Sequence, residues 1–156
     1  MRDTVRPADS GAVAELVAST GFFSPDEQSI AVELVDETLD RGDASGYHFL
    51  FADADDGSLS GYTCFGPIPA TTESFDLYWI AVSPRAQRQG LGSALLRESE
   101  AAIRRLGGKR VYIDTSGRAQ YAPTRAFYAS AGYAVAADLE DFYGRGDAKV
   151  IFCKPL

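Results

Sequence analysis

Apolar and polar residues alternate along this chain with two periods, and the two periods predict different elements. Apolar side chains recur every three to four residues, as on one face of an α-helix, in four segments: 8–20, 25–41, 90–106 and 122–132. Shorter β-branched and aromatic runs predict strands over 4–7, 47–54, 59–67, 74–82, 109–116, 133–143 and 148–156. An Asp-Gly turn at residues 56 and 57 joins two of these runs as a hairpin.

The helical pattern also predicts which side chains face the core. The first helix is expected to be capped by Asp9 or Ser10. The expected inward residues are Val13, Leu16 and Val17 in the first helix, Ile30, Leu34 and Val35 in the second, and Leu91, Leu95, Ala102 and Leu106 in the third. Glycines at 107 and 108 are expected to end the third helix.

The order of the elements, β-α-α-β-β-β-α-β-α-β-β, indicates a mixed α/β (α+β) fold with helices packed on the faces of one sheet. The chain has 156 residues, of which 46% are hydrophobic, and it contains no repeat, linker or low-complexity segment. We therefore expect a single domain spanning residues 1–156.

Charge and cysteine content narrow the classes of partner. The formal net charge of −7 and the absence of a long Lys/Arg run argue against nucleic acid and against an anionic membrane, whereas a cationic substrate would be attracted. Cys64 and Cys153 lack metal-finger spacing, so we expect buried free thiols and no metal. The first residues include no apolar signal segment, and we expect a cytoplasmic protein.

The segment "PRAQRQGLGSALLRE" (84–98) raises the question of function, because two glycines separate a strand from a helix. The backbone N–H groups of such a loop and the positive end of the helix dipole suit a pyrophosphate. A dinucleotide fingerprint would need glycine where Leu95 stands, and a Walker loop would need a lysine that the segment lacks. The alternative is a tight turn without a ligand.

Two separated motifs resemble the GCN5-related N-acetyltransferases, the GNAT family. "IAVSPRAQRQGLGSALL" is similar to the family's acetyl-CoA motif, with Gln87, Gly90 and Gly92 at the signature positions. "YAPTRAFYASAGY" is similar to its second cofactor segment, and the predicted element order matches the family over nearly the whole chain. The resemblance implies a mostly antiparallel sheet of six to seven strands that splays between the fourth and fifth strands, here 74–82 and 109–116.

The resemblance also implies how acetyl-CoA is bound as co-substrate. The backbone of the fourth strand would pair with the pantetheine arm, and the amides of the loop would hold the pyrophosphate. The residues concerned are Ile80, Ala81 and Val82 on the strand, and Gln87, Arg88, Gln89, Gly90, Leu91, Gly92 and Ser93 in the loop. Tyr121 occupies the position where many members carry an asparagine that contacts the cofactor, which marks a variant branch.

Two residues are candidates for catalysis. Tyr128 aligns with the tyrosine that in many members protonates the departing thiolate; the alternative is an aromatic residue packed beside Phe127. Asp76 stands eleven residues before Gln87, where some histone-acetylating members place a glutamate base. It could act as a base, attract an ammonium group, or be a solvated residue at the start of a strand. Glu73, Asp114 and Asp141 are weaker candidates, and His48 is expected to serve packing.

The sequence thus predicts an N-acetyltransferase that moves an acetyl group from acetyl-CoA directly to a primary amine of a small molecule or protein. A non-catalytic acyl-CoA sensor of the same fold is the alternative. The expected acceptor pocket combines aromatic and acidic residues that suit a cationic amine: Phe22, Phe23, Asp76, Tyr78, Glu140, Asp141, Phe142 and Tyr143. A homodimer is common in the family, and the last strand could form its interface or lie inside the sheet.

Overall fold

The computed structural model describes residues 1–156. The chain forms two compact units: unit 1 comprises Met1–Gly66 and Trp79–Ala102, and unit 2 comprises Pro67–Tyr78 and Ile103–Leu156. The helices are α1 (Asp9–Ser19), α2 (Pro25–Arg41), α3 (Leu91–Arg105) and α4 (Ala122–Ser130). The strands are β1 (His48–Asp53), β2 (Leu59–Pro67), β3 (Ser74–Val82), β4 (Arg110–Ser116), β5 (Ala134–Gly144) and β6 (Asp147–Pro155).

The strands are hydrogen-bonded in the order β1-β2-β3-β4-β6-β5, which confirms the predicted mixed fold, with six strands. Pairs β1–β2, β4–β6 and β5–β6 are antiparallel, and β3–β4 is parallel. The last strand, β6, lies between β4 and β5 and is therefore internal, which decides between the two places expected for it. None of the α-helices combines the length and the apolar character that a membrane-spanning helix requires.

The strand predicted over 4–7 does not form. Arg2 instead makes one antiparallel bridge with Phe51, with N···O distances of 2.9 and 2.8 Å. The Arg2 guanidinium binds Asp9 at 2.5 Å and Asp53 at 2.8 Å, so it joins the start of α1 to the end of β1. Pro7 cannot donate to a ladder, and α1 begins two residues later, so the segment cannot extend as a strand.

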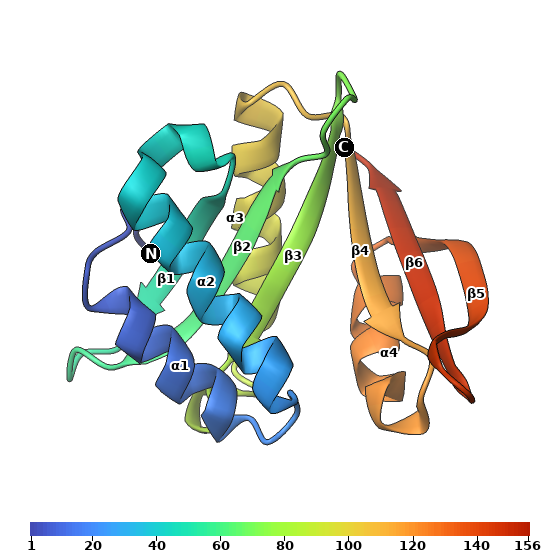
Figure 1. Ribbon diagram of the computed structural model, residues 1–156, viewed down its shortest axis with the longest axis horizontal. Coiled ribbons are helices and arrows are strands. Elements are labelled where there is room, and N and C mark those ends of the chain that lie inside the picture. Colours follow the sequence, from blue (N-terminus) through green and yellow to red (C-terminus); the bar gives the residue numbers. More distant parts are fainter. The chain divides into compact units, whose positions relative to one another are not determined.

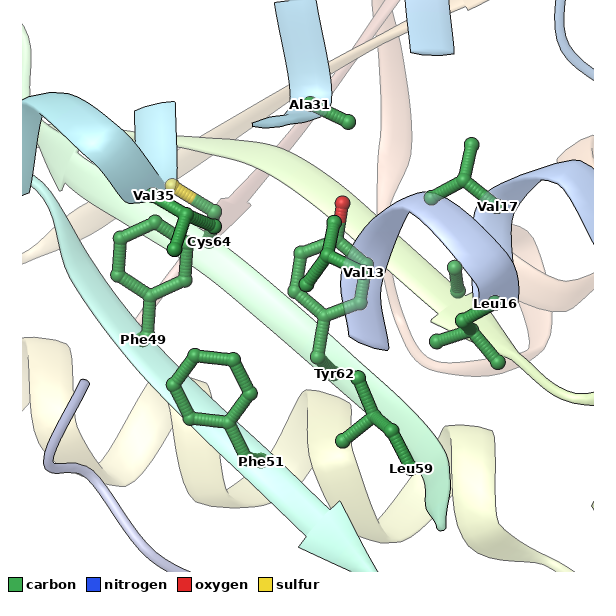
Figure 2. Packing of buried hydrophobic residues seen from close by; sticks show 11 residues of the cluster. Val13, Leu16, Val17, Ala31, Val35, Phe49, Phe51, Leu59, Tyr62 and Cys64 are labelled. Atoms are coloured by element: carbon green, nitrogen blue, oxygen red, sulfur yellow. The ribbon is translucent and has the colours of Figure 1, made fainter. Parts of the chain in front are cut away.

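In unit 1, α1 and α2 cover one face of β1 and β2 (Figures 1 and 2). Apolar side chains from these four elements and from β3 form a buried cluster of eleven residues: Val13, Leu16, Val17, Ala31, Val35, Phe49, Phe51, Leu59, Tyr62, Cys64 and Ala81. Figure 2 shows the Tyr62 hydroxyl beside Val13, and this oxygen has no hydrogen-bond partner. The three residues predicted to face inward from α1 are confirmed.

Helix α3 lies against the opposite face of this sheet (Figure 1). Thr63 of β2 and Ser99 of α3 share a buried hydrogen bond of 2.9 Å between their hydroxyl oxygens. A Cβ on Gly61 would lie 3.0 Å from Leu95 Cδ1, so glycine allows the helix to approach the strand closely. The close approach fixes where the first turn of α3 stands relative to β2.

Several expected details of the helices are wrong. Asp9 lies inside α1 and accepts a hydrogen bond from the Arg6 N–H at 2.7 Å, and no side chain caps this helix. Ile30 is 48% exposed, whereas Ala31 and Val35, four residues apart, point inward. Leu106 is 49% exposed because α3 ends one residue earlier, and the buried residues of α3 are Leu95, Leu96, Ser99, Glu100 and Ile103.

In unit 2, β4 pairs with β3 on one side and β6 on the other, and α4 covers one face (Figure 1). The covered face is apolar, since Phe152 of β6 contacts the Tyr128 ring of α4 with 5.7 Å between centroids. The register places Ile113 opposite Phe152 and Tyr112 opposite Cys153, so the two faces alternate along the strands. Cys64 is buried and Cys153 half-buried, and both thiols are free.

Candidate active site

The end of β3 in unit 1 carries the residues expected to face a pantetheine arm. Ala81 is buried, and Ile80 and Val82 are half-buried. A Cβ on Gly61 would lie 3.0 Å from the Ala81 carbonyl oxygen, which places this part of β3 directly beside β2. The Ser83 N–H then donates to the Ser60 carbonyl at 2.8 Å and fixes the exit from the strand.

The loop between β3 and α3 is held by its own polar side chains. A short 3₁₀ turn, Pro84–Ala86, follows Ser83. Gln87 Nε2 donates to the Val82 carbonyl at 3.2 Å, and Gln89 Nε2 donates to the Arg85 carbonyl at 2.9 Å. Gln87 thus binds the end of β3 and Gln89 binds the 3₁₀ turn, so both side chains shape the loop from within.

Two residues of this loop adopt positive φ angles, +61° at Arg88 and +80° at Gly90. The glycine was expected from the motif, but the left-handed conformation of Arg88 has no signal in the sequence. A non-glycine residue in this region of φ and ψ carries a conformational cost of about 1 kcal/mol or more. The surrounding hydrogen bonds hold the loop in this shape.

Helix α3 begins directly after the loop, and its first turn can bind an anion. The Ala94 N–H donates to the Gly90 carbonyl at 3.0 Å, which closes the first turn. The N–H groups of Leu91, Gly92 and Ser93 precede the first intrahelical bond, and the helix dipole is positive at this end. Ser93 and residues 87–90 are exposed.

Asp76 lies in the first half of β3, in unit 2. The parallel pairing with β4 joins Ser74 to Arg110, Phe75 to Val111 and Asp76 to Tyr112. Asp76 is thus the last paired residue of β3 in this unit, and Leu77 and Tyr78 continue beyond the ladder. The strand therefore leaves β4 directly after the predicted base.

Burial raises the pKa of the Asp76 carboxyl to about 6, and the nearby Asp114 carboxylate adds to the rise. The Lys149 ammonium acts in the opposite direction. A pKa near 6 leaves the group ionised above neutral pH and makes it a stronger base than an ordinary aspartate by roughly a hundredfold. Asp76 is thus half-buried rather than fully solvated, and its role as a proton acceptor stays a prediction.

Tyr128 lies on α4, on the other face of the unit 2 sheet from Asp76. Its side chain is 5% exposed and packs among three rings, those of Phe127, Tyr133 and Phe152, at centroid distances of 5.4, 6.1 and 5.7 Å. Burial raises the pKa of its phenol well above the usual value near 10. The hydroxyl is therefore protonated at neutral pH and can only donate or accept a hydrogen bond there.

The segment that leads from β4 into α4 is fixed by a polar cluster that the sequence did not reveal. The buried Asp147 carboxylate accepts a hydrogen bond from the Ser116 hydroxyl and pairs with Arg118 at 3.0 Å. Arg125 donates to the carbonyls of Ser116 and Arg118 at 2.7 and 2.9 Å. Tyr121 is half-buried at the N-cap position of α4, makes no capping hydrogen bond with its side chain, and donates its N–H to the Arg118 carbonyl at 3.0 Å.

The weaker candidates have structural partners. Glu73 forms an ion pair with Lys109, and Asp141 accepts a hydrogen bond from the Gly146 N–H at 2.6 Å in the β5–β6 turn. His48 stacks on Phe65 with 5.7 Å between centroids, as expected for a packing residue. Burial lowers the pKa of this imidazole, which keeps it neutral at pH 7.

The residues expected to form an acceptor pocket are divided between the two units. Phe22 and Phe23 belong to unit 1, where Phe23 packs edge-on against Trp79 at 4.9 Å. The other six lie in unit 2: Asp76, Tyr78, Glu140, Asp141, Phe142 and Tyr143. Within unit 2, the ring of Phe142 lies 4.8 Å from the Lys149 ammonium.

Comparison with known families assigns this architecture. The family model for the acetyltransferase (GNAT) family matches residues 15–133. The chain belongs to the GNAT acetyltransferase family. The motif of residues 80–93 and the segment around Tyr128 both fall within the matched residues.

Solved structures agree with this assignment. A protein from Desulfovibrio desulfuricans assigned to the GNAT acetyltransferases shares 50% sequence identity with this chain at a TM-score of 0.96, with 99% of this chain and 96% of that chain covered. The aminoglycoside 6'-N-acetyltransferase of Enterococcus faecium, 17% identical, has a TM-score of 0.76 over 99% and 97% of the two chains. The ribosomal-protein-S18-alanine N-acetyltransferase of Escherichia coli, 22% identical, has a TM-score of 0.74 over 99% and 94%. At these lower identities the likeness establishes the fold alone, and no curated protein matches the chain.

Proposed function

We propose that this GNAT acetyltransferase transfers the acetyl group of acetyl-CoA directly to a primary amine. The observation that carries the proposal is the loop at the start of α3, where exposed backbone and the positive end of a helix meet. A 16% identical structure of the same fold, an aminoglycoside 6'-N-acetyltransferase, was solved with coenzyme A, which supports the choice of donor.

Donor binding rests mainly on backbone groups. The main chain of Ile80, Ala81 and Val82 would pair with the amides of the pantetheine arm as an added strand does. The N–H groups of residues 87–93 would hold the pyrophosphate, with Arg88 and Ser93 adding a charge and a hydroxyl. Tyr121, at the entry to α4, would contact the cofactor through its hydroxyl, which cannot reproduce the donor-acceptor pair of the asparagine in other members.

Proton removal from the acceptor is the role proposed for Asp76. An alkyl ammonium has a pKa of about 10.4 and must lose a proton before its nitrogen can attack. The pKa of Asp76 near 6 narrows the gap between the pKa of the carboxyl and the pKa of the ammonium. The carboxylate would take the proton directly or through a water molecule. The same carboxylate would attract the ammonium as it enters.

The remaining steps concern the thioester. A backbone N–H of Ile80 or Ala81 would polarise the thioester carbonyl as negative charge develops on its oxygen. Tyr128 would then donate to the departing thiolate, whose conjugate thiol has a pKa of about 8.5 and is a tolerable leaving group. Because burial keeps the phenol protonated, Tyr128 is available as a donor throughout the neutral range.

The acceptor is proposed to be cationic. The chain carries a net charge of −7, and the face of the unit 2 sheet opposite α4 bears Asp76, whose neighbour Asp114 is paired with Lys149. Among the structures of the same fold, one enzyme is named for an aminoglycoside and another for a ribosomal protein. Both small molecules and protein amines therefore belong in the first substrate panel.

Replacing Tyr128 with phenylalanine separates an enzyme from a non-catalytic acyl-CoA sensor. The enzyme is expected to lose at least about tenfold in kcat, measured by thiol release from acetyl-CoA with an amine panel, while acetyl-CoA affinity stays near native. Tyr133→Phe is the matched control, since Tyr133 packs in the same aromatic cluster. Equal turnover in native protein and Tyr128→Phe would remove Tyr128 from the mechanism, and no turnover with any amine would favour the sensor.

The pH dependence tests Asp76. The value of kcat/KM should rise as the pH increases through about 6 and the Asp76 carboxyl ionises, since only the carboxylate accepts a proton. Asp76→Asn should lower kcat/KM by about a hundredfold or more and abolish this limb, whereas Asp138→Asn on the exposed face of β5 should leave both unchanged. A retained limb in Asp76→Asn would assign the base to another group.

A further inference from the structure

Asp76, Asp114 and Lys149 share one face of the unit 2 sheet. Asp76 is paired with Tyr112, and Asp114 follows Tyr112 by two residues on β4, so the two carboxylates point to the same side. Asp114 is opposite Ile151, and Lys149 precedes Ile151 by two residues on β6. This face is the one that α4 leaves uncovered, because the opposite face carries Phe152 against Tyr128.

Lys149 is held in place on this face by two contacts. Its ammonium lies 2.6 Å from the Asp114 carboxylate and 4.8 Å from the centre of the Phe142 ring. The Lys149 side chain is only 20% exposed, against 43% for Asp114. An ion pair with a partly buried member and a ring beneath it is more strongly held than an open surface pair.

The charged and titratable groups around Asp76 in unit 2 act with opposite signs. Tyr78 lies on the same side of β3, Tyr112 and Asp114 face it from β4, Lys149 from β6, and Tyr143 of β5 acts on Lys149. After burial, Asp114 raises the pKa of Asp76 and Lys149 lowers it. Each member of the ion pair thus partly cancels the effect of the other on Asp76.

We infer that Asp114 and Lys149 are positioning residues whose ion pair controls the charge on Asp76. Lys149 neutralises Asp114 and so limits the repulsion that Asp114 exerts on a second carboxylate on the same face. Asp114 in turn holds the Lys149 ammonium, which lies on β6, and β4 separates β6 from the strand that carries Asp76. The consequence for turnover rests on the proposed role of Asp76 as the base; the effect on its charge does not.

The test is a carbon-13 NMR titration of the aspartate carboxyl groups, with the Asp76 signal assigned from Asp76→Asn. Removing the cation in Lys149→Met should raise the Asp76 midpoint by roughly 0.5–1 pH unit, because Asp114 is then uncompensated. Removing the carboxylate in Asp114→Asn should lower the midpoint by a similar amount. Lys149→Arg should stay near native, and Lys109→Met, which breaks the separate ion pair with Glu73, should not shift the midpoint.

Opposite shifts in the two variants support the inference, since a merely structural role would not give them opposite signs. Unchanged midpoints, or shifts of the same sign, would overturn it. The pH profile of kcat/KM is measured beside the titration and should move with the midpoint. If the NMR midpoints shift in opposite directions but the pH profile of kcat/KM does not move with them, the ion pair controls the charge on Asp76 and Asp76 is not the base.

Discussion

At the scale of single residues, the core of unit 1 contains one polar atom that its surroundings do not satisfy. The Tyr62 hydroxyl is fully buried and has no hydrogen-bond partner, while the Thr63 hydroxyl beside it in sequence bonds to Ser99 on the other face of the sheet. Burying an unpaired hydroxyl costs about 1–3 kcal/mol, whereas a satisfied one contributes about 1 kcal/mol. The Tyr62 hydroxyl therefore destabilises the fold, whereas the Thr63 hydroxyl of the next residue stabilises it.

Tyr62→Phe is expected to leave the free energy of unfolding unchanged or raise it by about 1 kcal/mol, because the variant removes only the unpaired oxygen. Thr63→Val should lower it by about 1 kcal/mol, because the buried hydrogen bond to Ser99 is lost while Ser99 keeps only its bond to the Leu95 carbonyl. Urea unfolding of the three proteins measures both differences. A loss of more than about 1 kcal/mol in Tyr62→Phe would mean that the hydroxyl is bonded in solution.

At the scale of elements, the sequence predicted the order and type of nearly all helices and strands. The hairpin at Asp56-Gly57, helix 25–41 and the final antiparallel pair have strong local signals, and these agree with the structure. Helix phase was less predictable: Ile30 is as apolar as Val35, and only the packing of α2 against the sheet decides which is buried. The first segment failed because Arg2, rather than residues 4–7, makes the bridge to β1.

Some features of the candidate site could also be predicted from local sequence, whereas others could not. The glycine loop and Tyr128 were predicted from motifs, because their function depends on local backbone or on one position in a helix. The ion pair of Asp114 with Lys149 and the hydrogen bond of Ser116 with Asp147 join residues more than thirty positions apart. Such pairs depend on the register between strands, which could not be predicted from this sequence.

The close packing of α3 on β2 gives a prediction at this scale. Gly61→Ala places a methyl group 3.0 Å from the Ala81 carbonyl oxygen and Leu95 Cδ1, so the backbone of β3 and the Leu95 side chain must give way by a few tenths of an ångström. We expect a loss of about 1–3 kcal/mol in the free energy of unfolding and weaker acetyl-CoA binding, since both elements border the loop. Gly11→Ala in α1 is the control, because nothing lies near its added methyl group and helix propensity favours alanine. Native stability and affinity in Gly61→Ala would show that the contact is not tight.

At the scale of the whole molecule, the two units carry different parts of the proposed reaction. Unit 1 holds the loop and the first turn of α3, which are suited to the phosphates of the donor. Unit 2 holds Asp76 and Tyr128, on opposite faces of its sheet, which are suited to proton transfer. β3 passes from one unit to the other and carries both the proposed base and the proposed pantetheine strand.

The central claim is that acetyl-CoA binds at the start of α3, and calorimetric titration of acetyl-CoA tests it most directly. We expect the native protein to bind acetyl-CoA in the micromolar range. Gly92→Glu puts a side chain and a negative charge among the amides proposed for the pyrophosphate, so it should abolish this binding. Gly11→Glu, the same substitution in open space on α1, should bind like the native protein. Equal binding in Gly92→Glu, or none in the native protein, would contradict the account.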